Sequence, residues 1–323
     1  MDYFLCGKGL IMDNLSIAKF SHGSFSNESL ISLLNLCFFS DNYIGNFPQI
    51  FEPGQEPYFY GVYDSKNNQL IAFCAVYPYL FTSPHFLRAY GVGSVCSHPD
   101  FRGQGIVTKL LDYVAKDLQK QDADFLFLFS EKRGLYENLG FELCGKSYLH
   151  KVRLKGRIEK LSDTRSVDNE FYSEQTRDLD FMSQCKVWYF IIQYQQKSEP
   201  ILSFLEFCKI LQIKNMSVYF LENKNEITAV CFLDKGDDFK KTIHGLYYKS
   251  KNDLKYLIEN VLKETSNSEL FLYTNEDIKN LSLIEDSFQI PTMFFKPLNP
   301  FSESVVKRMV ENNEVFVGSL QGV

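Results

Sequence analysis

An apolar strand-like segment gives way to a helical one within "SVCSHPDFRGQGIVTKLLDYV" (94–114), and the turn between them holds Arg102, Gly103, Gln104 and Gly105. The first amides of a helix have no partner inside the helix and carry the positive end of its dipole, so they attract anions. Glycines let that backbone approach a ligand without a Cβ, and an arginine adds a charge or braces the loop. The turn predicts a phosphate cradle; the alternative is an ordinary strand-to-helix turn whose glycines supply positive φ angles.

The segments on either side of the turn must position it. Apolar residues after the turn recur at the spacing of one buried helical face: Val107, Leu110, Leu111, Val114 and Leu118. The preceding "AYGVGSVCS" (89–97) is an apolar strand that contains Gly91 and Gly93. Glycine inside a strand often marks a bulge or the close approach of a ligand. The turn has neither a P-loop ending nor a G-x-G-x-x-G fingerprint, so amides alone would hold the anion.

Composition limits the class of protein. The 323 residues are 45% hydrophobic and 15% aromatic, which is enough to fill the cores of two ordinary domains. The net charge of −6 and the lack of a dense Lys/Arg stripe disfavour nucleic acid as a partner. The N-terminus is a poor signal peptide, and no apolar run is long enough to span a membrane, so we expect a cytoplasmic protein that does not bind membranes.

The cysteines show no metal-site or disulfide spacing. No CxxC pair occurs, and several cysteines lie in apolar strand-like runs, so they are typical of core residues in a reducing compartment. The eight are Cys6, Cys37, Cys74, Cys96, Cys144, Cys185, Cys208 and Cys231.

A faint internal repeat predicts two similar units. The hairpin pattern of residues 59–76 recurs at 218–233, and the helical "LLDYVAKD" (110–117) is echoed by "LIENVLKE" (257–264). Each helix is followed by a polar break and a strand, "DFLFLFS" and then "ELFLYTN". A chance likeness between α/β units is the alternative to a duplication.

The spacing between the copies differs. Ala72 and Ala229 are 157 positions apart, whereas Leu110 and Leu257 are 147 apart, so the second copy is shorter between hairpin and helix. We expect the missing residues to correspond to the turn "HPDFRGQGIV". The polar segment 155–170 is the expected connection, and 181–212 is expected to form helices interrupted at Pro200.

The turn "HPDFRGQGIV" (98–107) resembles the acyl-CoA loop of the GNAT superfamily of N-acetyltransferases, whose Arg/Gln-x-x-Gly-x-Gly/Ala pattern is matched by Arg102 and Gly105. "LYENLGFE" (135–142) is similar to a second family signature, Tyr-x-x-x-Gly-Phe, which follows the fifth strand. The resemblance covers residues 12–152, and the second half echoes only the scaffold. It implies an α/β (α+β) fold of two GNAT-like units, each a mixed, mostly antiparallel twisted sheet flanked by helices.

The resemblance also implies a division of labour between the units. Residues 1–155 would form the acyl-CoA-binding domain, and residues 156–323 a degenerate copy that lacks the pyrophosphate loop and does not bind acyl-CoA productively. The co-substrate would be acetyl-CoA or another acyl-CoA, with no metal.

Individual residues receive roles by the same resemblance. Backbone groups of Val95 and Ser97 would pair with the pantetheine arm, and amides from Arg102 to Thr108 would hold the pyrophosphate. Tyr136 matches the position of the acid that protonates the leaving thiolate, and the alternative is a packed aromatic with a satisfied hydroxyl. The full cofactor-binding set is Val95, Cys96, Ser97, Arg102, Gly103, Gln104, Gly105, Ile106, Val107 and Thr108.

The sequence does not identify a general base. The strand position at which some relatives carry a catalytic glutamate corresponds to Ala89, beside Tyr90. A water chain or a side chain could serve instead; the side chains considered are Asp41, Glu52, His85 and His150.

The function that follows from the resemblance is an acyl-CoA-dependent N-acyltransferase, with transfer of acetyl from acetyl-CoA to a small-molecule or peptide amine by direct attack in a ternary complex. One alternative is a non-catalytic protein that binds or senses acyl-CoA. Another is a tRNA-dependent aminoacyl transferase, which the acidic charge balance and the intact loop disfavour.

Overall fold

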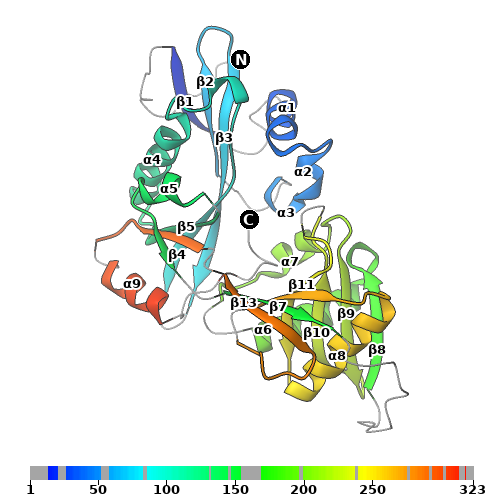
Figure 1. Cartoon of the computed structure of the whole chain (residues 1–323). Helices are drawn as coiled ribbons and strands as arrows, with labels where there is room; N and C mark the ends of the chain where they lie inside the picture. The colour runs from blue at the N-terminus through cyan, green and yellow to red at the C-terminus, as the bar shows by residue number, and fades with distance from the viewer. Residues whose placement is uncertain are drawn as a thin grey trace. The chain divides into compact units, whose positions relative to one another are not determined.

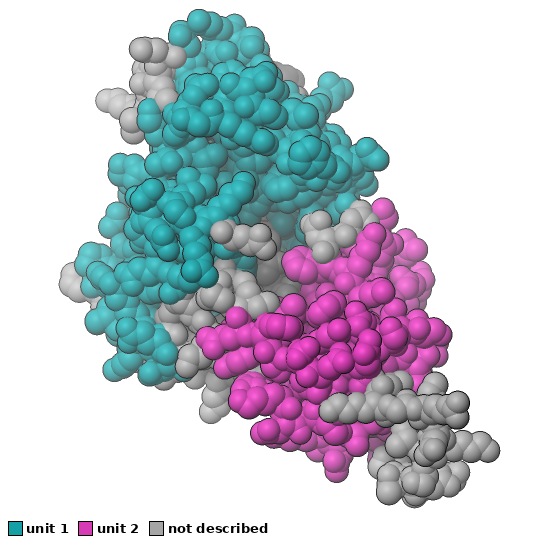
Figure 2. Space-filling model, in the orientation of Figure 1, with its two compact units in different colours: residues 1–145, 292–315, 323 teal, residues 146–291, 316–322 magenta. Residues whose placement is uncertain are grey.

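Two seven-stranded sheets, one in each of two units, form the framework of the chain (Figure 1). Unit 1 comprises residues 1–145, 292–315 and 323, and unit 2 comprises residues 146–291 and 316–322 (Figure 2). The computed structural model describes residues 14–20, 27–51, 58–82, 86–130, 132–144, 147–153, 169–195, 199–236, 239–274, 277–290, 293–300, 303–312 and 317.

The sheet of unit 1 has the order β1-β2-β3-β4-β5-β14-β6. Only β4 and β5 pair in parallel, and every other neighbouring pair is antiparallel. The long strand β3 is an almost continuous run of buried apolar and aromatic residues, as a strand covered on both faces requires. The strands are β1 (Leu15–Phe20), β2 (Tyr58–Asp64), β3 (Gln69–Phe81), β4 (Leu87–Ser97), β5 (Phe125–Phe129), β6 (Glu142–Cys144) and β14 (Met293–Pro297).

Helices cover both faces of this sheet (Figure 1). The core on one face contains residues of α1 and α3 together with Phe73, and the core on the other contains residues of α4 and α5 with Ala72 and Cys74. Because successive strand residues alternate in direction, β3 contributes to both cores. The helices are α1 (Asn27–Phe38), α2 (Tyr43–Asn46), α3 (Pro48–Phe51), α4 (Ile106–Gln119), α5 (Arg133–Glu137) and α9 (Glu303–Glu311), with a 3-10 turn at Pro99–Phe101.

Unit 2 repeats the arrangement. Its sheet has the order β13-β7-β12-β11-β10-β9-β8, and only β11 and β12 are parallel. One core contains residues of α8, and the other contains residues of α6 and α7. The elements are β7 (Ser147–Val152), β8 (Asn169–Gln175), a 3-10 turn at Thr176–Asp178, α6 (Phe181–Tyr194), α7 (Phe204–Ile210), β9 (Ser217–Asn223), β10 (Glu226–Leu233), β11 (Thr242–Tyr248), α8 (Lys251–Glu264), β12 (Leu270–Thr274) and β13 (Ile284–Ile290).

The two units exchange one strand each. In unit 1, β14 from near the C-terminus lies between β5 and β6, and in unit 2, β7 lies between β12 and β13. The two compact units therefore differ from the contiguous ranges 1–155 and 156–323 that we expected, since β7 belongs to the second unit and β14 to the first. The predicted connection at 155–170 lies mostly outside the described residues.

The two-unit α/β fold predicted from the repeat is confirmed. The hairpins β2–β3 and β9–β10 occupy equivalent positions in their sheets, as do helices α4 and α8. The break between helices α6 and α7 also falls around Pro200, as predicted. Among the described residues, no helix is both long and apolar enough to cross a membrane.

The location of the ten-residue shortfall differs from the prediction. A β-bulge at the same place in each unit aligns Ala75 with Phe232, 157 positions apart, and Gly93 with His244, 151 positions apart. Six of the missing residues therefore lie between the third and fourth strands. The other four lie between the fourth strand and the helix, because Leu110 and Leu257 are 147 apart.

Candidate active site

The fourth strand of unit 1 contains a β-bulge near its C-terminal end. Pairing with β3 jumps from Ala75↔Gly93 to Phe73↔Cys96, so β4 carries one extra residue there. Ser94 within the bulge has a φ of 52°, a conformation that L-residues seldom adopt. The bulge follows Gly91 and Gly93, where the strand glycines predicted one.

Strands β4 and β5 separate beyond the bulge. Their parallel pairing covers Ala89↔Phe125, Tyr90↔Leu126 and Gly91↔Phe127, and no later residue of β4 pairs with the described part of β5. The predicted pantetheine-binding residues Val95, Cys96 and Ser97 lie on this later part, where β4 pairs only with β3. In the described part of the chain no strand pairs with the other edge of this segment, where the Ser97 carbonyl accepts from the side chains of Arg102 and Cys37.

The turn from β4 to α4 is held by short-range contacts. The Nδ1 atom of His98 accepts a hydrogen bond from the Asp100 amide at 3.3 Å. This bond caps the 3-10 turn at Pro99–Phe101. The Nε group of Arg102 donates to the Ser97 carbonyl at 3.3 Å, and the side-chain amide of Gln104 donates to the Asp100 carbonyl at 3.4 Å. Arg102 thus braces the loop.

Both glycines of the loop have a left-handed backbone. Gly103 has a φ of 77° and Gly105, the N-cap of α4, has a φ of 73°. A Cβ added at either position would meet no atom within 4 Å, so the backbone conformation, and not crowding by the protein, selects glycine. These φ angles also agree with the alternative hypothesis, an ordinary strand-to-helix turn whose glycines supply positive φ angles.

The start of α4 presents unpartnered amides. In the fully described segment 98–109, the amides from Gly103 to Thr108 donate to no carbonyl or side chain. The side chain of Ile106 is buried and that of Val107 packs against the same core, so only their amides can face a ligand. This group of amides, at the positive end of a 14-residue helix with no acidic residue in its first turn, fits an anion.

Tyr136 lies in α5 with its ring buried. The ring centroid is 6.0 Å from that of Phe141 and 5.8 Å from that of Phe294, and the side chain is 6% exposed. Burial raises the pKa of Tyr136 above its ordinary value, while a hydrogen bond from the Ser130 side chain opposes the shift. The hydroxyl is therefore protonated at neutral pH, as a proton donor must be.

The candidates for a general base divide into three groups. Asp41 is exposed, and its backbone carbonyl accepts a hydrogen bond from the side chain of Asn35. His150 lies in β7 of unit 2, where its Nδ1 atom is 2.7 Å from the Ser287 hydroxyl. Glu52 and His85 lie outside the described residues.

The structure adds side chains that sequence patterns missed. The Tyr43 hydroxyl lies 3.2 Å from the Ser94 hydroxyl at the bulge, and the Cys37 thiol donates to the Ser97 carbonyl at 3.3 Å. The strand glycines in the sequence predicted the bulge of β4. They did not predict which residues of the α1–α2 region contact this strand.

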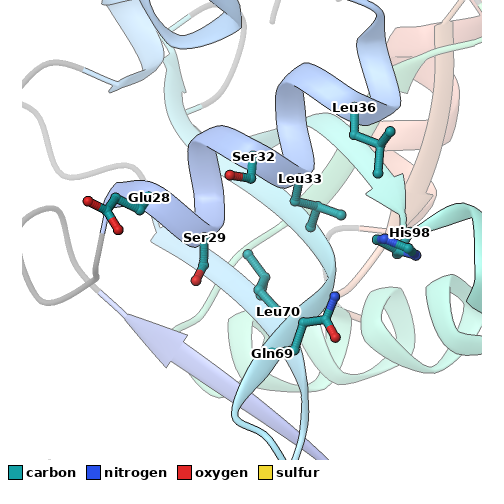
Figure 3. A pocket seen from close by; sticks show the side chains of 8 residues that line it. All are labelled: Glu28, Ser29, Ser32, Leu33, Leu36, Gln69, Leu70 and His98. Atoms are coloured by element: carbon teal, nitrogen blue, oxygen red, sulfur yellow. The ribbon is translucent and has the colours of Figure 1, made fainter.

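A pocket of about 340 Å³ lies beside this end of β4 (Figure 3). It lies between α1, the start of β3 and His98, and Glu28 is one of its lining residues. The Glu28 carboxylate would repel an anionic ligand in this pocket, so we do not assign the pocket to the pyrophosphate of a ligand. The lining residues are Glu28, Ser29, Ser32, Leu33, Leu36, Gln69, Leu70 and His98.

Unit 1 is therefore a mixed sheet whose bulged fourth strand separates from the fifth and leads through a glycine-containing loop into a helix. Residues 23–144 match the acetyltransferase (GNAT) domain family. The N-terminal unit of this chain is therefore a GNAT acetyltransferase domain. A search of curated proteins finds no match to the sequence.

Solved structures share the fold across both units. A conserved protein from Enterococcus faecalis V583 is 13% identical, with a TM-score of 0.68 over 88% of this chain and 73% of that chain. A GCN5-related N-acetyltransferase from Kribbella flavida is 12% identical, with a TM-score of 0.62 over 87% and 70%. A tandem GNAT protein from the clavulanic acid biosynthesis pathway is 10% identical, with a TM-score of 0.57 over 88% and 99%.

Proposed function

We propose that unit 1 transfers an acetyl group from acetyl-CoA to the nitrogen of a small-molecule or peptide amine. The observation that carries this proposal is the row of unpartnered amides from Gly103 to Thr108, at the start of α4 and directly after the bulged strand. The match of residues 23–144 to the GNAT acetyltransferase domain supports the choice of an acyl-CoA as the anion.

In this proposal the co-substrate lies along two backbone segments. The pyrophosphate accepts hydrogen bonds from the amides of Gly103 to Thr108. The Arg102 amide, which the sequence also predicted as a donor, instead donates to the Pro99 carbonyl at 3.2 Å, and its side chain holds the loop through the Ser97 carbonyl. The pantetheine arm pairs with the edge of β4 around Val95 and Ser97, where β5 has separated. Backbone amides near the bulge would polarise the thioester carbonyl.

The transfer requires a nucleophilic amine and a proton for the leaving group. The amine nitrogen attacks the thioester carbonyl carbon, the carbon–sulfur bond breaks, and the thiolate takes a proton. Tyr136 supplies that proton, supported by its motif and by the burial that keeps its hydroxyl protonated at neutral pH. A water chain or a side chain removes the amine proton, and no residue is assigned to this step.

Unit 2 has no acyl-CoA site in this proposal. The Ser250 hydroxyl caps the Asp253 amide, and the Asp253 carboxylate lies in the first turn of α8, where it disfavours an anion. One acyl-CoA per chain is the expected stoichiometry.

The proposal is tested by titrating the protein with acetyl-CoA in a calorimeter, beside Gly105→Glu and Gly105→Asn. Asparagine tolerates the left-handed backbone at this position without a charge, whereas glutamate adds a carboxylate next to the pyrophosphate. We expect binding to be lost in Gly105→Glu and kept in Gly105→Asn. Equal binding by the two variants would refute the assigned cradle.

A panel of amines, with detection of released thiol, then separates an enzyme from a protein that only binds acyl-CoA. Thiol release that depends on an amine is the expected result. Tight binding without turnover by any cationic, aromatic or peptide amine would favour the binding protein.

A further inference from the structure

Two thiols from different elements meet beside the loop of unit 1. Cys37 lies near the end of α1 and packs against the core that contains Cys96 of β4. The Cys37 thiol donates to the carbonyl of Ser97, the residue after Cys96, at 3.3 Å. Cys37 is half-buried, whereas Cys96 is 7% exposed.

The surroundings of Cys37 favour a reactive thiol. The Ser97 carbonyl that accepts from Cys37 also accepts from Arg102 Nε, which places the guanidinium near the thiol. The interaction with Cys96 and the charge of Arg102 lower the pKa of Cys37 to about 7, although burial opposes the shift. Burial and the contact with Cys37 raise the pKa of Cys96. A thiolate beside a guanidinium, with a protonated thiol as its neighbour, is the arrangement of an oxidisable cysteine and its resolving partner.

We propose that Cys37 and Cys96 form a hydroperoxide-sensitive modification site that closes to an intramolecular disulfide. The Cys37 sulfur attacks one peroxide oxygen, the oxygen–oxygen bond breaks, and the products with hydrogen peroxide are a Cys37 sulfenic acid and hydroxide. The Cys96 sulfur then displaces the sulfenic oxygen, which leaves as water with the Cys96 proton. The two sulfurs lose two electrons in total, and the peroxide gains them.

The disulfide would alter the loop. In the reduced protein, the Ser97 carbonyl accepts from both Cys37 Sγ and Arg102 Nε, each at 3.3 Å. Oxidation removes the thiol proton, and with it one of these two bonds. Resting on the proposed function, we expect acetyl-CoA to bind about 5-fold more weakly to the oxidised protein.

The chain contains a matched control. Cys185 and Cys208 in unit 2 are also half-buried and interact with each other, but burial raises the pKa of Cys208 and no arginine is among the groups that perturb it. The side chain of Cys208 instead faces Gln184, with Sγ 3.8 Å from Oε1. This pair reports what two nearby cysteines do without a guanidinium.

The experiment treats the reduced full-length protein with hydrogen peroxide and maps its peptides by mass spectrometry after blocking the remaining thiols. We expect a linked Cys37–Cys96 peptide at peroxide concentrations that leave Cys185 and Cys208 reduced. Cys37→Ser should abolish the link. In Cys96→Ala, a dimedone adduct should accumulate on Cys37, and if that variant does not fold, the pseudo-first-order rate of alkylation of Cys37 in the wild-type protein replaces it.

The outcome that overturns the proposal is a Cys37 thiol that reacts no faster than Cys185 and Cys208, or a peroxide product that links Cys37 to another cysteine. Neither readout requires acetyl-CoA. A linked peptide in a protein that fails to bind acetyl-CoA would therefore support the modification site and refute the proposed function.

Discussion

Helices α4 and α8 occupy the same place in their units but differ in their N-cap and first-turn residues. The α4 N-cap is Gly105, which makes no side-chain cap, and the first turn carries no acidic residue. The α8 N-cap is Ser250, whose hydroxyl accepts the Asp253 amide at 3.2 Å and donates to the Asp253 carboxylate at 2.6 Å. The first amides of α4 have no side-chain cap, whereas in α8 a side chain caps the Asp253 amide and a carboxylate lies in the first turn.

The scaffold around the two helices is otherwise shared. Each fourth-strand equivalent carries a bulge with a positive φ, 52° at Ser94 and 54° at Gly245. Each also stops pairing with its parallel neighbour before the strand ends, at Gly91 in β4 and at Ile243 in β11. The bulge and the splayed strands therefore belong to the shared fold, whereas the proposed anion binding would depend on a few residues of the loop in unit 1.

Removing the exchanged strand should have the largest effect. A chain ending at residue 290 lacks β14, so Phe294, which is fully buried, no longer packs against Tyr136, and β5 and β6 lose the strand between them. We expect unit 1 not to fold, with rapid proteolysis of residues 1–145 and no acetyl-CoA binding. A chain ending at residue 312 is the control, and a chain ending at 290 that still binds acetyl-CoA would contradict this role of β14.

Tyr136→Phe should lower kcat about 100-fold, the scale of a lost general acid, and leave the KM for acetyl-CoA nearly unchanged. Because burial raises the pKa of Tyr136, the wild-type hydroxyl stays protonated, and loss of this acid should not reduce kcat at neutral or mildly alkaline pH. Initial rates against pH test both points. A variant with unchanged kcat would mean that Tyr136 is only a packed aromatic residue.

Giving α4 the acidic first turn of α8 should weaken binding moderately. Thr108 is three residues beyond the N-cap of α4, as Asp253 is in α8, so Thr108→Asp places a carboxylate among the proposed pyrophosphate-binding amides. We expect the Kd for acetyl-CoA to rise about 10-fold, or about 1.4 kcal/mol. Thr108→Asn is the neutral control of the same shape, and equal Kd values for the two variants would argue against a charge effect.

The smallest effect is expected in unit 2. Ser250→Ala removes the α8 cap and should reduce the free energy of unfolding by about 1 kcal/mol, measured by urea denaturation. Acetyl-CoA should still bind once per chain, because the Asp253 carboxylate remains. A second bound acetyl-CoA in this variant would show that the cap alone closed the site in unit 2.

Local patterns in the sequence predicted much of the site. The apolar periodicity of residues 107–118 predicted helix α4, and Gly91 and Gly93 predicted the bulge. The two similar hairpin patterns predicted the repeated unit. These features depend on short-range preferences, namely helical periodicity, the conformational freedom of glycine and turn chemistry. The residues of the loop could therefore be named before its geometry was known.

Long-range contacts could not be predicted in the same way. The segment "MFFKP" (293–297) is a short apolar run that could pair with any edge, and nothing in its sequence assigns it to β5 and β6 of the other unit. The contacts of Tyr43 with Ser94 and of Cys37 with Ser97 join residues 51 and 60 positions apart. Such contacts follow from packing of α1 and α2 on the sheet, which periodicity does not specify.

Hydrogen–deuterium exchange with and without acetyl-CoA tests the central claim most directly, since it compares the two helix N-termini in one protein. We predict that acetyl-CoA slows exchange in peptides covering 98–109 and leaves peptides covering 245–256 unchanged. Protection of the α8 peptides, or protection elsewhere with none at 98–109, would contradict the assignment of the acyl-CoA site to the start of α4.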